Sequence, residues 1–251
     1  MVIKKIMLWS LAALVGSVGF ASAATQQTFA DNFNDGICNP ALWYVPGWVD
    51  AKLKENSQKL RFYSHPTNSA LNQASEWDAI FNKKCNDGDS LTVSGKVRMP
   101  HMIPSDPGGP IVNSVEIGLG LNQSLTNNNC IELTVRDSQS NRQFVVYYLT
   151  ETPEIEWEYR SFPAPTNLSV FNLKMSYFAD TDTIRFFWAD PKDNVWQKVC
   201  PNMKLSDLFG PALRRKMFPY VAGYTDNVTL PPEWEVWIDN FTAVYQDQPQ
   251  S

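Results

Sequence analysis

Three glutamates recur at every second position in the segment EIEWEY, residues 154–159. In a β-strand every second side chain points to the same face, so Glu154, Glu156 and Glu158 would lie side by side. Hydrolysis of a glycosidic bond with retention needs two carboxylates about 5–5.5 Å apart, one as nucleophile and one as acid and base. The spacing therefore makes these three glutamates candidate catalytic residues. A solvated edge strand is the competing interpretation, because acidic side chains keep such an edge soluble.

A second group of candidate residues comes from three predicted strands in the middle of the chain. Apolar residues alternate in segments 115–121, 131–135 and 144–148, so if they face a core their neighbours face away from it. The neighbours that could bind a ligand are Glu116, Glu132, Arg136 and Tyr147. Gly118 and Gly120 would leave room for a ligand beside them. Such a surface suits a sugar, whose hydroxyls need polar partners and whose rings stack on aromatics. Ordinary solvent-facing residues are the alternative.

The chain is also rich in tryptophan, with nine residues of this type. Trp43, Trp48 and Trp77 lie in or beside predicted loops, and Trp234 follows two prolines. Exposed tryptophans in loops are typical of carbohydrate recognition, and Trp77 is included here as a candidate ligand-binding residue. Packing in a core or a loop is the alternative, because a large sandwich also needs aromatic residues inside.

Composition excludes several other kinds of chemistry. The chain has only two histidines, and it contains no zinc-protease, serine-hydrolase, phosphate-loop or dinucleotide-binding motif, so any chemistry would rest on carboxylates. Its net charge of −5 disfavours nucleic acid and anionic membrane surfaces as partners. No cofactor is predicted from these motifs.

The N-terminal residues 1–23 have the three parts of a signal peptide. Two lysines precede an apolar stretch, which ends at the small residues Ala21-Ser22-Ala23. A membrane anchor is the alternative, but the apolar stretch is short for a hydrocarbon layer of about 30 Å. We therefore predict a bacterial-type signal that is cleaved, a secreted or periplasmic protein, and a single domain over residues 24–251. Removal of these 23 residues from 251 leaves 228, and loss of the two lysines changes the net charge from −5 to −7.

Export would allow disulfide bonds, and the chain has four cysteines. None is spaced as C-x-x-C, which disfavours a zinc ribbon or a redox site. Two structural bridges are predicted, with three pairings open. Cys38–Cys85 and Cys130–Cys200 are favoured because neighbours in sequence are often neighbours in space.

Short segments with apolar residues at every second position follow one another along most of the chain. They are 91–99, 115–121, 131–135, 144–148, 155–159, 173–177, 184–188, 195–196 and 236–241. Segments of this length with turn residues between them indicate an antiparallel sandwich or barrel. One or two short helical turns are expected within 205–217, interrupted at Gly210-Pro211.

Several of these segments, taken in order, resemble a known superfamily. They are FADNFNDG at 29–36, Trp43, KLRF at 59–62, SLTVSGKVR at 90–98, IRFFW at 184–188, NVW at 194–196 and WIDNF at 237–241. Together they resemble the concanavalin A-like lectin/glucanase superfamily over about residues 28–245. The resemblance implies an all-β fold, an antiparallel jelly-roll β-sandwich in which the first and last strands pair and the concave sheet commonly holds saccharide.

The resemblance also implies two sites. Members of the superfamily often carry a structural calcium near the paired termini, and Asp239 matches the aspartate of the last strand, with Asp31 expected nearby. Laminarinase-type members carry a Glu-x-Asp-x-Glu strand; here Glu156 replaces the middle aspartate, which puts that role in doubt.

The expected function is carbohydrate binding on the concave sheet, with a polysaccharide or other glycan as partner and no membrane insertion. A retaining glycoside hydrolase of laminarinase type that uses the glutamate-rich strand is the first alternative. A structural or adhesive surface module that binds protein is the second, because this fold serves many functions.

Overall fold

The structure is a computed structural model of the 251-residue chain. It describes residues 24–45, 51–64, 73–100, 112–121, 129–138, 141–152, 154–210, 216–225 and 236–248. The predicted signal peptide, Trp48 and Trp234 lie outside these residues. Among the described residues, no helix is long and apolar enough to cross a membrane.

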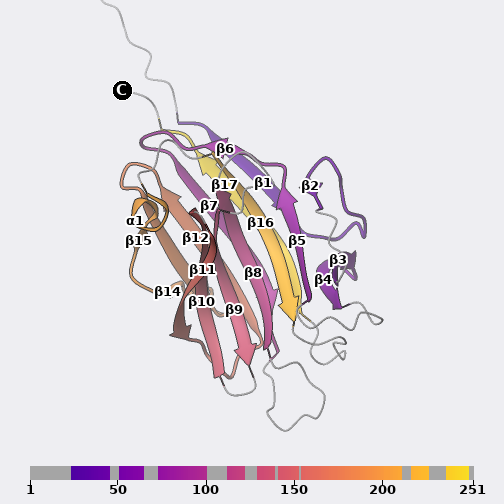
Figure 1. Ribbon diagram of the computed structural model, residues 1–251. Coiled ribbons are helices and arrows are strands. Elements are labelled where there is room, and N and C mark those ends of the chain that lie inside the picture. Colours follow the sequence, from indigo (N-terminus) through magenta and orange to yellow (C-terminus); the bar gives the residue numbers. More distant parts are fainter. Residues whose placement is uncertain are drawn as a thin grey trace, which may run out of the picture.

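Two antiparallel sheets face each other, and Figure 1 shows the two layers. Sheet A has the strand order β14-β13-β12-β7-β17-β4-β3, with β1 beside β17 and β15 beside β13. Its strands are β1 (Gln26–Asp31), β3 (Ala51–Asn56), β4 (Lys59–Ser64), β7 (Ser90–Arg98), β12 (Val170–Phe178), β13 (Thr183–Ala189), β14 (Gln197–Lys198), β15 (Met203–Lys204) and β17 (Trp237–Gln246).

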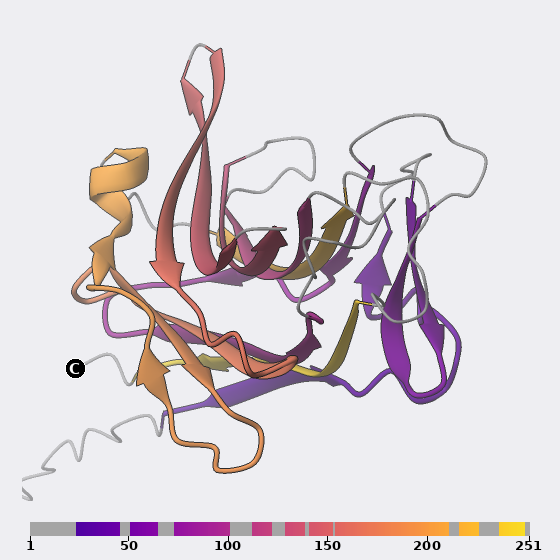
Figure 2. The same ribbon diagram turned by 90° about the horizontal axis from the view of Figure 1, so that it is seen from below.

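Sheet B has the order β11-β10-β9-β8-β16-β5-β2, with β6 beside β16. Its strands are β2 (Trp43–Tyr44), β5 (Gln73–Ala79), β6 (Lys83–Lys84), β8 (Val112–Leu121), β9 (Cys130–Ser138), β10 (Asn141–Thr152), β11 (Glu154–Pro163) and β16 (Lys216–Thr225). The tip of the β10–β11 hairpin stands out from the two layers, close to helix α1 (Leu205–Phe209) (Figure 2). The predicted all-β antiparallel sandwich is confirmed.

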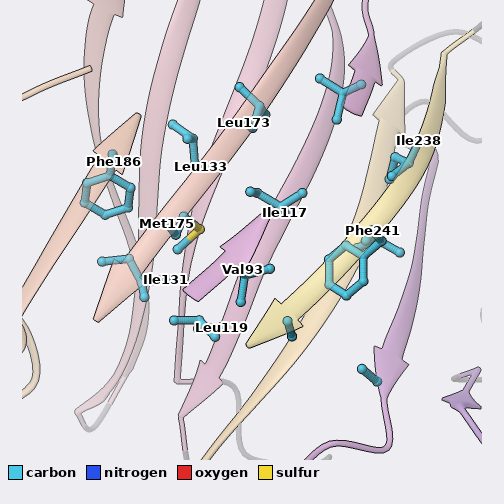
Figure 3. Packing of buried hydrophobic residues seen from close by; sticks show 14 of the residues in the cluster. Val93, Ile117, Leu119, Ile131, Leu133, Leu173, Met175, Phe186, Ile238 and Phe241 are labelled. Atoms are coloured by element: carbon cyan, nitrogen blue, oxygen red, sulfur yellow. The ribbon is translucent and has the colours of Figure 1, made fainter. Parts of the chain in front are cut away.

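The core fills the space between the sheets, and alternation along each strand supplies it. In β7 every second residue from Leu91 is buried, and the residues between are half-buried on the other side. Figure 3 shows the side chains of β7, β12, β13 and β17 meeting those of β8 and β9. The residues labelled there are Val93, Ile117, Leu119, Ile131, Leu133, Leu173, Met175, Phe186, Ile238 and Phe241. Each is removed from water almost completely, and a side chain of this kind contributes about 1.5–3 kcal/mol by such burial.

The two ends of the described chain lie side by side in sheet A. β1 pairs with β17 in antiparallel register, from Gln26 opposite Gln246 to Asp31 opposite Phe241. This pairing confirms the closure by first and last strands that the resemblance implied. The pairing places β1, the first strand, in the same sheet as β17, the last strand.

The segment expected to hold helical turns divides into two different elements. α1 spans only Leu205–Phe209 and ends at Gly210, whose φ of 77° a side chain rarely adopts. Met217, which was counted with the helical spacing, lies instead in β16, a strand that the sequence did not predict. The strand expected at 195–196 is also displaced, because β14 begins at Gln197 after a turn in which Asn194 has a φ of 55°.

Candidate functional site

The outer face of sheet B, the face turned away from the core, carries a cluster of four carboxyl groups. Trp77 of β5, Ile117 of β8, Leu133 of β9 and Val221 of β16 are buried in the core. Because side chains alternate along a strand, the neighbours of these residues point to the outer face. The carboxyl groups placed there are Glu76 and Asp78 of β5, Glu116 of β8 and Glu132 of β9.

Strand register aligns these groups into two rows that cross the sheet. The first row is Asp78, Tyr220, Gly118, Glu132, Tyr147 and Tyr159, each directly opposite the next on β5, β16, β8, β9, β10 and β11. The second row is Glu76, Ala222, Glu116 and Thr134 on β5, β16, β8 and β9. Neighbouring strands lie about 4.8 Å apart, so the first row extends across about 24 Å of the sheet. These central strands lie side by side in Figure 1.

Hydrogen bonds join the carboxyl groups in two pairs. One hydrogen bond links Glu76 with Asp78 and another links Glu116 with Glu132, so each pair shares a proton. The hydroxyl of Tyr220 donates to Glu132 Oε2 over 2.7 Å. On β8, Ser114 Oγ donates to Glu116 Oε1 over 2.8 Å. The cluster therefore consists of two hydrogen-bonded pairs that interact through their charges, rather than of four separate side chains.

Burial sets the protonation of this network, because an ionised carboxylate loses its hydration there. Glu132 is 6% exposed and Asp78 is 3% exposed. Burial, followed by the hydrogen bond and charge of Asp78, raises the pKa of Glu76 to about 9. Burial also raises the pKa of Asp78 and of Glu116, and burial with the charge of Glu116 raises the pKa of Glu132 well above its usual range. Carboxyl groups perturbed in this way gather at functional sites more often than elsewhere.

Two aromatic rings cover the glycines of β8. A Cβ on Gly118 would lie 2.1 Å from Cζ of Tyr220, and a Cβ on Gly120 would lie 2.1 Å from Cζ of Phe218. The expectation that these glycines leave room for a ligand is therefore wrong, since rings from β16 fill the space. The glycines instead allow Phe218 and Tyr220 to lie flat across the neighbouring strand, which holds the Tyr220 hydroxyl against Glu132.

Tyrosines and one arginine continue the outer face beyond the carboxyl cluster. Arg136 Nη1 donates to the hydroxyl of Tyr147 over 2.9 Å. The ring of Tyr147 lies 5.8 Å from that of Tyr159, which is 61% exposed. At the other end of the sheet, the exposed Tyr44 of β2 lies opposite Asp78. The carboxyl cluster is thus flanked along the sheet by aromatic side chains.

The structure brings together four of the five predicted ligand-binding residues. Glu116, Glu132, Arg136 and Tyr147 share the outer face of sheet B, as the alternation predicted. Trp77 does not, because it is only 2% exposed and its ring packs in the core against Phe33 and Trp43. Its selection as a ligand-binding residue is therefore wrong.

The glutamate-rich segment forms β11, the edge strand of sheet B. Glu158 is exposed and accepts a hydrogen bond from Tyr148, a core-facing residue of β10 that lies opposite it. It therefore faces the side opposite to Glu132. Glu154 and Glu156 pair with Thr152 and Thr150, and their side chains lie outside the described residues.

The two aspartates considered for calcium do not converge. Both carboxylate oxygens of Asp31 accept hydrogen bonds over 2.7 Å, Oδ1 from the amide of Phe33 and Oδ2 from the indole of Trp43. Asp239 lies opposite Lys96, on the outer face of sheet A. Among the described residues, no group of three or more His, Cys, Asp or Glu side chains could hold a metal ion. Asp31 and Asp239 therefore do not fit a shared calcium site.

All four cysteines are free thiols, so the predicted bridges Cys38–Cys85 and Cys130–Cys200 are absent from the structure. Cys85 and Cys200 are buried in the core cluster. Cys130 packs instead against Phe218, Tyr220 and Ala222 on the outer face of sheet B. Cys200 thus lies in the core, whereas Cys130 packs on the outer face of sheet B. The order of the cysteines along the chain does not reveal this separation.

The sequence did not identify Glu76, Asp78 or Tyr220 as members of the site. Reading Trp77 as a core residue would have placed its two neighbours, Glu76 and Asp78, on the outer face by alternation. Tyr220 was missed together with β16, whose Pro219 disfavours a central strand. Pro219 is tolerated because β6 pairs with residues 216–217 and β5 with residues 220–225, which leaves position 219 between them.

Several solved protein structures have the same overall fold as this chain. An endo-1,3-β-glucanase from Streptomyces sioyaensis superposes with a TM-score of 0.62 at 12% identity, over 91% of this chain and 98% of that one. Lectin I from Ulex europaeus, in complex with the methyl glycoside of α-L-fucose, gives a TM-score of 0.55 at 12% identity, over 89% and 98%. Peanut lectin gives 0.55 at 10% identity, over 90% and 100%.

The fold is the concanavalin A-like jelly roll. This confirms the fold that the ordered segments implied, since the likeness covers nearly the whole chain. No family model and no curated protein sequence matches the chain. At 9–12% identity the concanavalin A-like neighbours share the architecture alone, so the function has to be argued from this chain's own residues.

Proposed function

We propose that this protein binds carbohydrate on the outer face of sheet B. The observation that carries the proposal is the row Asp78, Tyr220, Gly118, Glu132, Tyr147 and Tyr159, which places two carboxyl groups and three aromatic rings in one line across the sheet. Sugars are recognised by polar groups that bond their hydroxyls and by flat rings that stack on their apolar faces. The row supplies polar groups and aromatic rings across six neighbouring strands of sheet B.

Two further observations support binding. Structural neighbours of this chain include lectins solved with galactose and with a fucoside, on the same jelly-roll architecture. The N-terminal sequence predicts export, and an exported protein meets polysaccharides outside the cytoplasm. The raised pKa of Glu76, about 9, keeps that carboxyl group protonated near neutral pH, and its remaining acceptor capacity can take a hydrogen bond from a sugar hydroxyl.

A glycan array, followed by calorimetry with the best ligand, tests the proposal. Tyr147→Ala and Glu132→Gln should each weaken binding by about tenfold, because each removes a ring or an ionisable group from the centre of the row. Ser94→Ala, on the outer face of sheet A, is the matched control and should bind as the wild type does. An array without any hit would contradict the proposal and favour an adhesive or structural module that binds protein.

Hydrolysis is the second candidate, favoured by the protonated carboxyl groups that face outward. A raised pKa suits a general acid. Retaining hydrolysis, however, needs carboxyl groups about 5–5.5 Å apart, whereas Glu116 and Glu132 share a hydrogen bond and are closer than that. Binding is therefore the function that the present geometry supports better.

Release of reducing ends from soluble β-glucans distinguishes the two. Hydrolysis that is lost in Glu132→Gln while binding is retained would establish an enzyme with this cluster as its centre. Loss in Glu154→Gln and Glu158→Gln instead would assign catalysis to the β11 strand. Binding without release of reducing ends from any β-glucan agrees with the proposed function.

A further inference from the structure

Within the part of the chain that the structure describes, the carboxyl cluster of sheet B has no positive partner. None of the described lysines, arginines or histidines forms an ion pair with Glu76, Asp78, Glu116 or Glu132. Arg136, the arginine on the same face, donates to Tyr147. The fold does pair a buried carboxylate elsewhere, since Asp137 and Arg142 form an ion pair with both side chains 0% exposed. Burial without a cation leaves these carboxyl groups protonated, as it does for the buried Glu55, whose pKa is raised to about 8, so a cationic ligand would have to displace those protons.

Two further polar atoms at the cluster are buried without a partner. Thr134 is 0% exposed and lies directly opposite Glu116, yet its Oγ1 has no hydrogen-bond partner among the described residues. Oδ1 of Asp78, on β5, is also buried without a hydrogen-bond partner among the described residues. Buried polar atoms are nearly always satisfied in folded proteins, so the unpaired hydroxyl of Thr134 and the unpaired carboxyl oxygen of Asp78 are positions that a polar ligand could fill.

The chemistry of these acceptors selects the donor. A protonated amine offers three N–H donors and one positive charge, and carries no acceptor that the carboxyl groups would have to oppose. The neighbouring rings of Tyr147 and Tyr159 favour a cation as well, through their electron-rich faces. A metal ion fits less well, because the described residues contain no group of three or more ligands that could hold one.

We propose that the glycan bound on the outer face of sheet B carries amino groups, and that Glu76, Asp78, Glu116 and Glu132 hold these groups as ammonium ions. The inference rests on the proposed function and names the class of sugar that the face selects. Each ammonium replaces a proton that the carboxyl pairs share in the free protein, so binding releases protons to the solvent.

Three β-1,4-linked hexamers that differ only at C2 of the sugar provide the test. They carry a hydroxyl, an N-acetyl group or a free amine, and they are compared by calorimetry at about pH 5.5, where the amine is charged. The amine hexamer should bind at least about tenfold more tightly than either neutral hexamer. Its measured enthalpy should depend on the ionisation enthalpy of the buffer, as proton release requires, and the enthalpies of the neutral hexamers should not.

Isosteric Glu→Gln variants show which carboxyl groups cause the tighter binding of the amine hexamer. Glu116→Gln and Glu76→Gln should each reduce the ratio of the affinity for the amine hexamer to the affinity for the neutral hexamers by about tenfold. Asp87→Asn, an exposed carboxylate on the turn before β7, is the matched control and should keep the full preference. Should either glutamate variant fail to fold, the comparison of the three hexamers on the wild type decides the matter.

Neutral hexamers that bind as tightly as the amine hexamer would overturn the inference and leave carbohydrate binding intact. The same conclusion follows if Asp87→Asn lowers the preference as much as Glu116→Gln does, because the attraction would then come from net charge alone. Failure of all three hexamers, with a different neutral glycan positive on the array, also overturns the inference alone. Failure on the array as well overturns the proposed function with it.

Discussion

At the scale of single residues, the four carboxyl groups of sheet B are held by partners that come from four strands, β5, β8, β9 and β16. Glu132 is restrained by Tyr220 on one side and by Glu116 on the other, and Ser114 restrains Glu116 in turn. Such restraint fixes the positions of donors and acceptors before a ligand arrives, which reduces the entropy lost on binding.

The pH dependence of stability should report the protonation of this cluster. The pKa of Glu76 is raised from 4.5 to about 9, so the folded state binds its proton more tightly than the unfolded state does. Stability is therefore highest below about pH 4.5 with respect to this group, and it falls as the pH rises from there to about 9. Thermal unfolding should show a lower Tm at pH 8 than at pH 5, and a smaller difference in Glu76→Gln.

In the control variant Asp87→Asn the difference in Tm between the two pH values should equal that of the wild type. A Glu76→Gln protein whose Tm changes with pH as much as the wild type's would show that Glu76 does not carry the effect.

Gly118 provides a second prediction at this scale. Gly118→Ala places a Cβ 2.1 Å from Cζ of Tyr220, so the ring has to move away from Glu132. Urea unfolding should show a loss of about 1–3 kcal/mol, the usual cost of overpacking. Gly95→Ala in β7 is the comparison, because there the nearest atom lies 3.4 Å from the added Cβ and the loss should be smaller. Equal losses in the two variants would contradict the close contact.

Sequence alone predicted the residues of the site that follow simple alternation. Glu116, Glu132, Arg136 and Tyr147 could be placed on one face because the apolar residues between them are unambiguous. The pairing of that face with β5 and β16 could not be predicted, because it depends on register between strands more than 30 residues apart in the chain.

At the scale of elements, strands were easiest to predict where turn-forming residues such as Asp and Thr separate two alternating segments. Turn-forming residues at 180–183 separate the alternating segments 173–177 and 184–188, and the structure has a turn at residues 179–182 in which Asp182 has a positive φ. β3, β5 and β16 were missed because charged residues or proline interrupt their alternation, and tertiary pairing supplies the order that the local pattern lacks. The prediction of β11 as a strand was right, but its place at the edge of sheet B depends on topology.

The hairpin of β9 and β10 depends on one buried ion pair. Arg142 donates to Asp137 and to the backbone carbonyl oxygens of Met99 and Leu168, which lie in the segments after β7 and before β12. Arg142→Met should therefore lower the free energy of unfolding by about 3–5 kcal/mol, because Asp137 is left as a buried charge. Urea unfolding measures the loss.

The double variant Asp137→Leu with Arg142→Met removes both charges and should recover part of that stability. A double variant less stable than Arg142→Met would show that the hydrogen bonds to Met99 and Leu168 matter more than the charge pair does.

At the scale of the whole molecule, the two outer faces differ in charge. The outer face of sheet A carries Lys96, Lys174 and Arg185, whereas the centre of the outer face of sheet B carries the four carboxyl groups. The cations of sheet A repel a positively charged ligand, whereas the protonated carboxyl groups of sheet B do not, so such a ligand is left with one side of the sandwich.

The state of the cysteines is a property of the whole chain and can be measured directly. Alkylation of the denatured, unreduced protein should modify all four thiols, because the structure holds each cysteine as a free thiol. Intact mass spectrometry counts the additions, and a reduced sample is the control. Fewer additions without reduction would restore the disulfides that the predicted export suggests, and the Tm would then fall on reduction.

The rings that lie across the glycines of β8 also constrain how this sequence can diverge. A side chain at position 118 requires a smaller residue at position 220, and the same holds for positions 120 and 218. Each pair is expected to change together in related sequences or not at all. A G-x-G on one strand, with an aromatic-x-aromatic on the strand beside it, is thus a signature by which distant relatives could be recognised after overall identity has been lost.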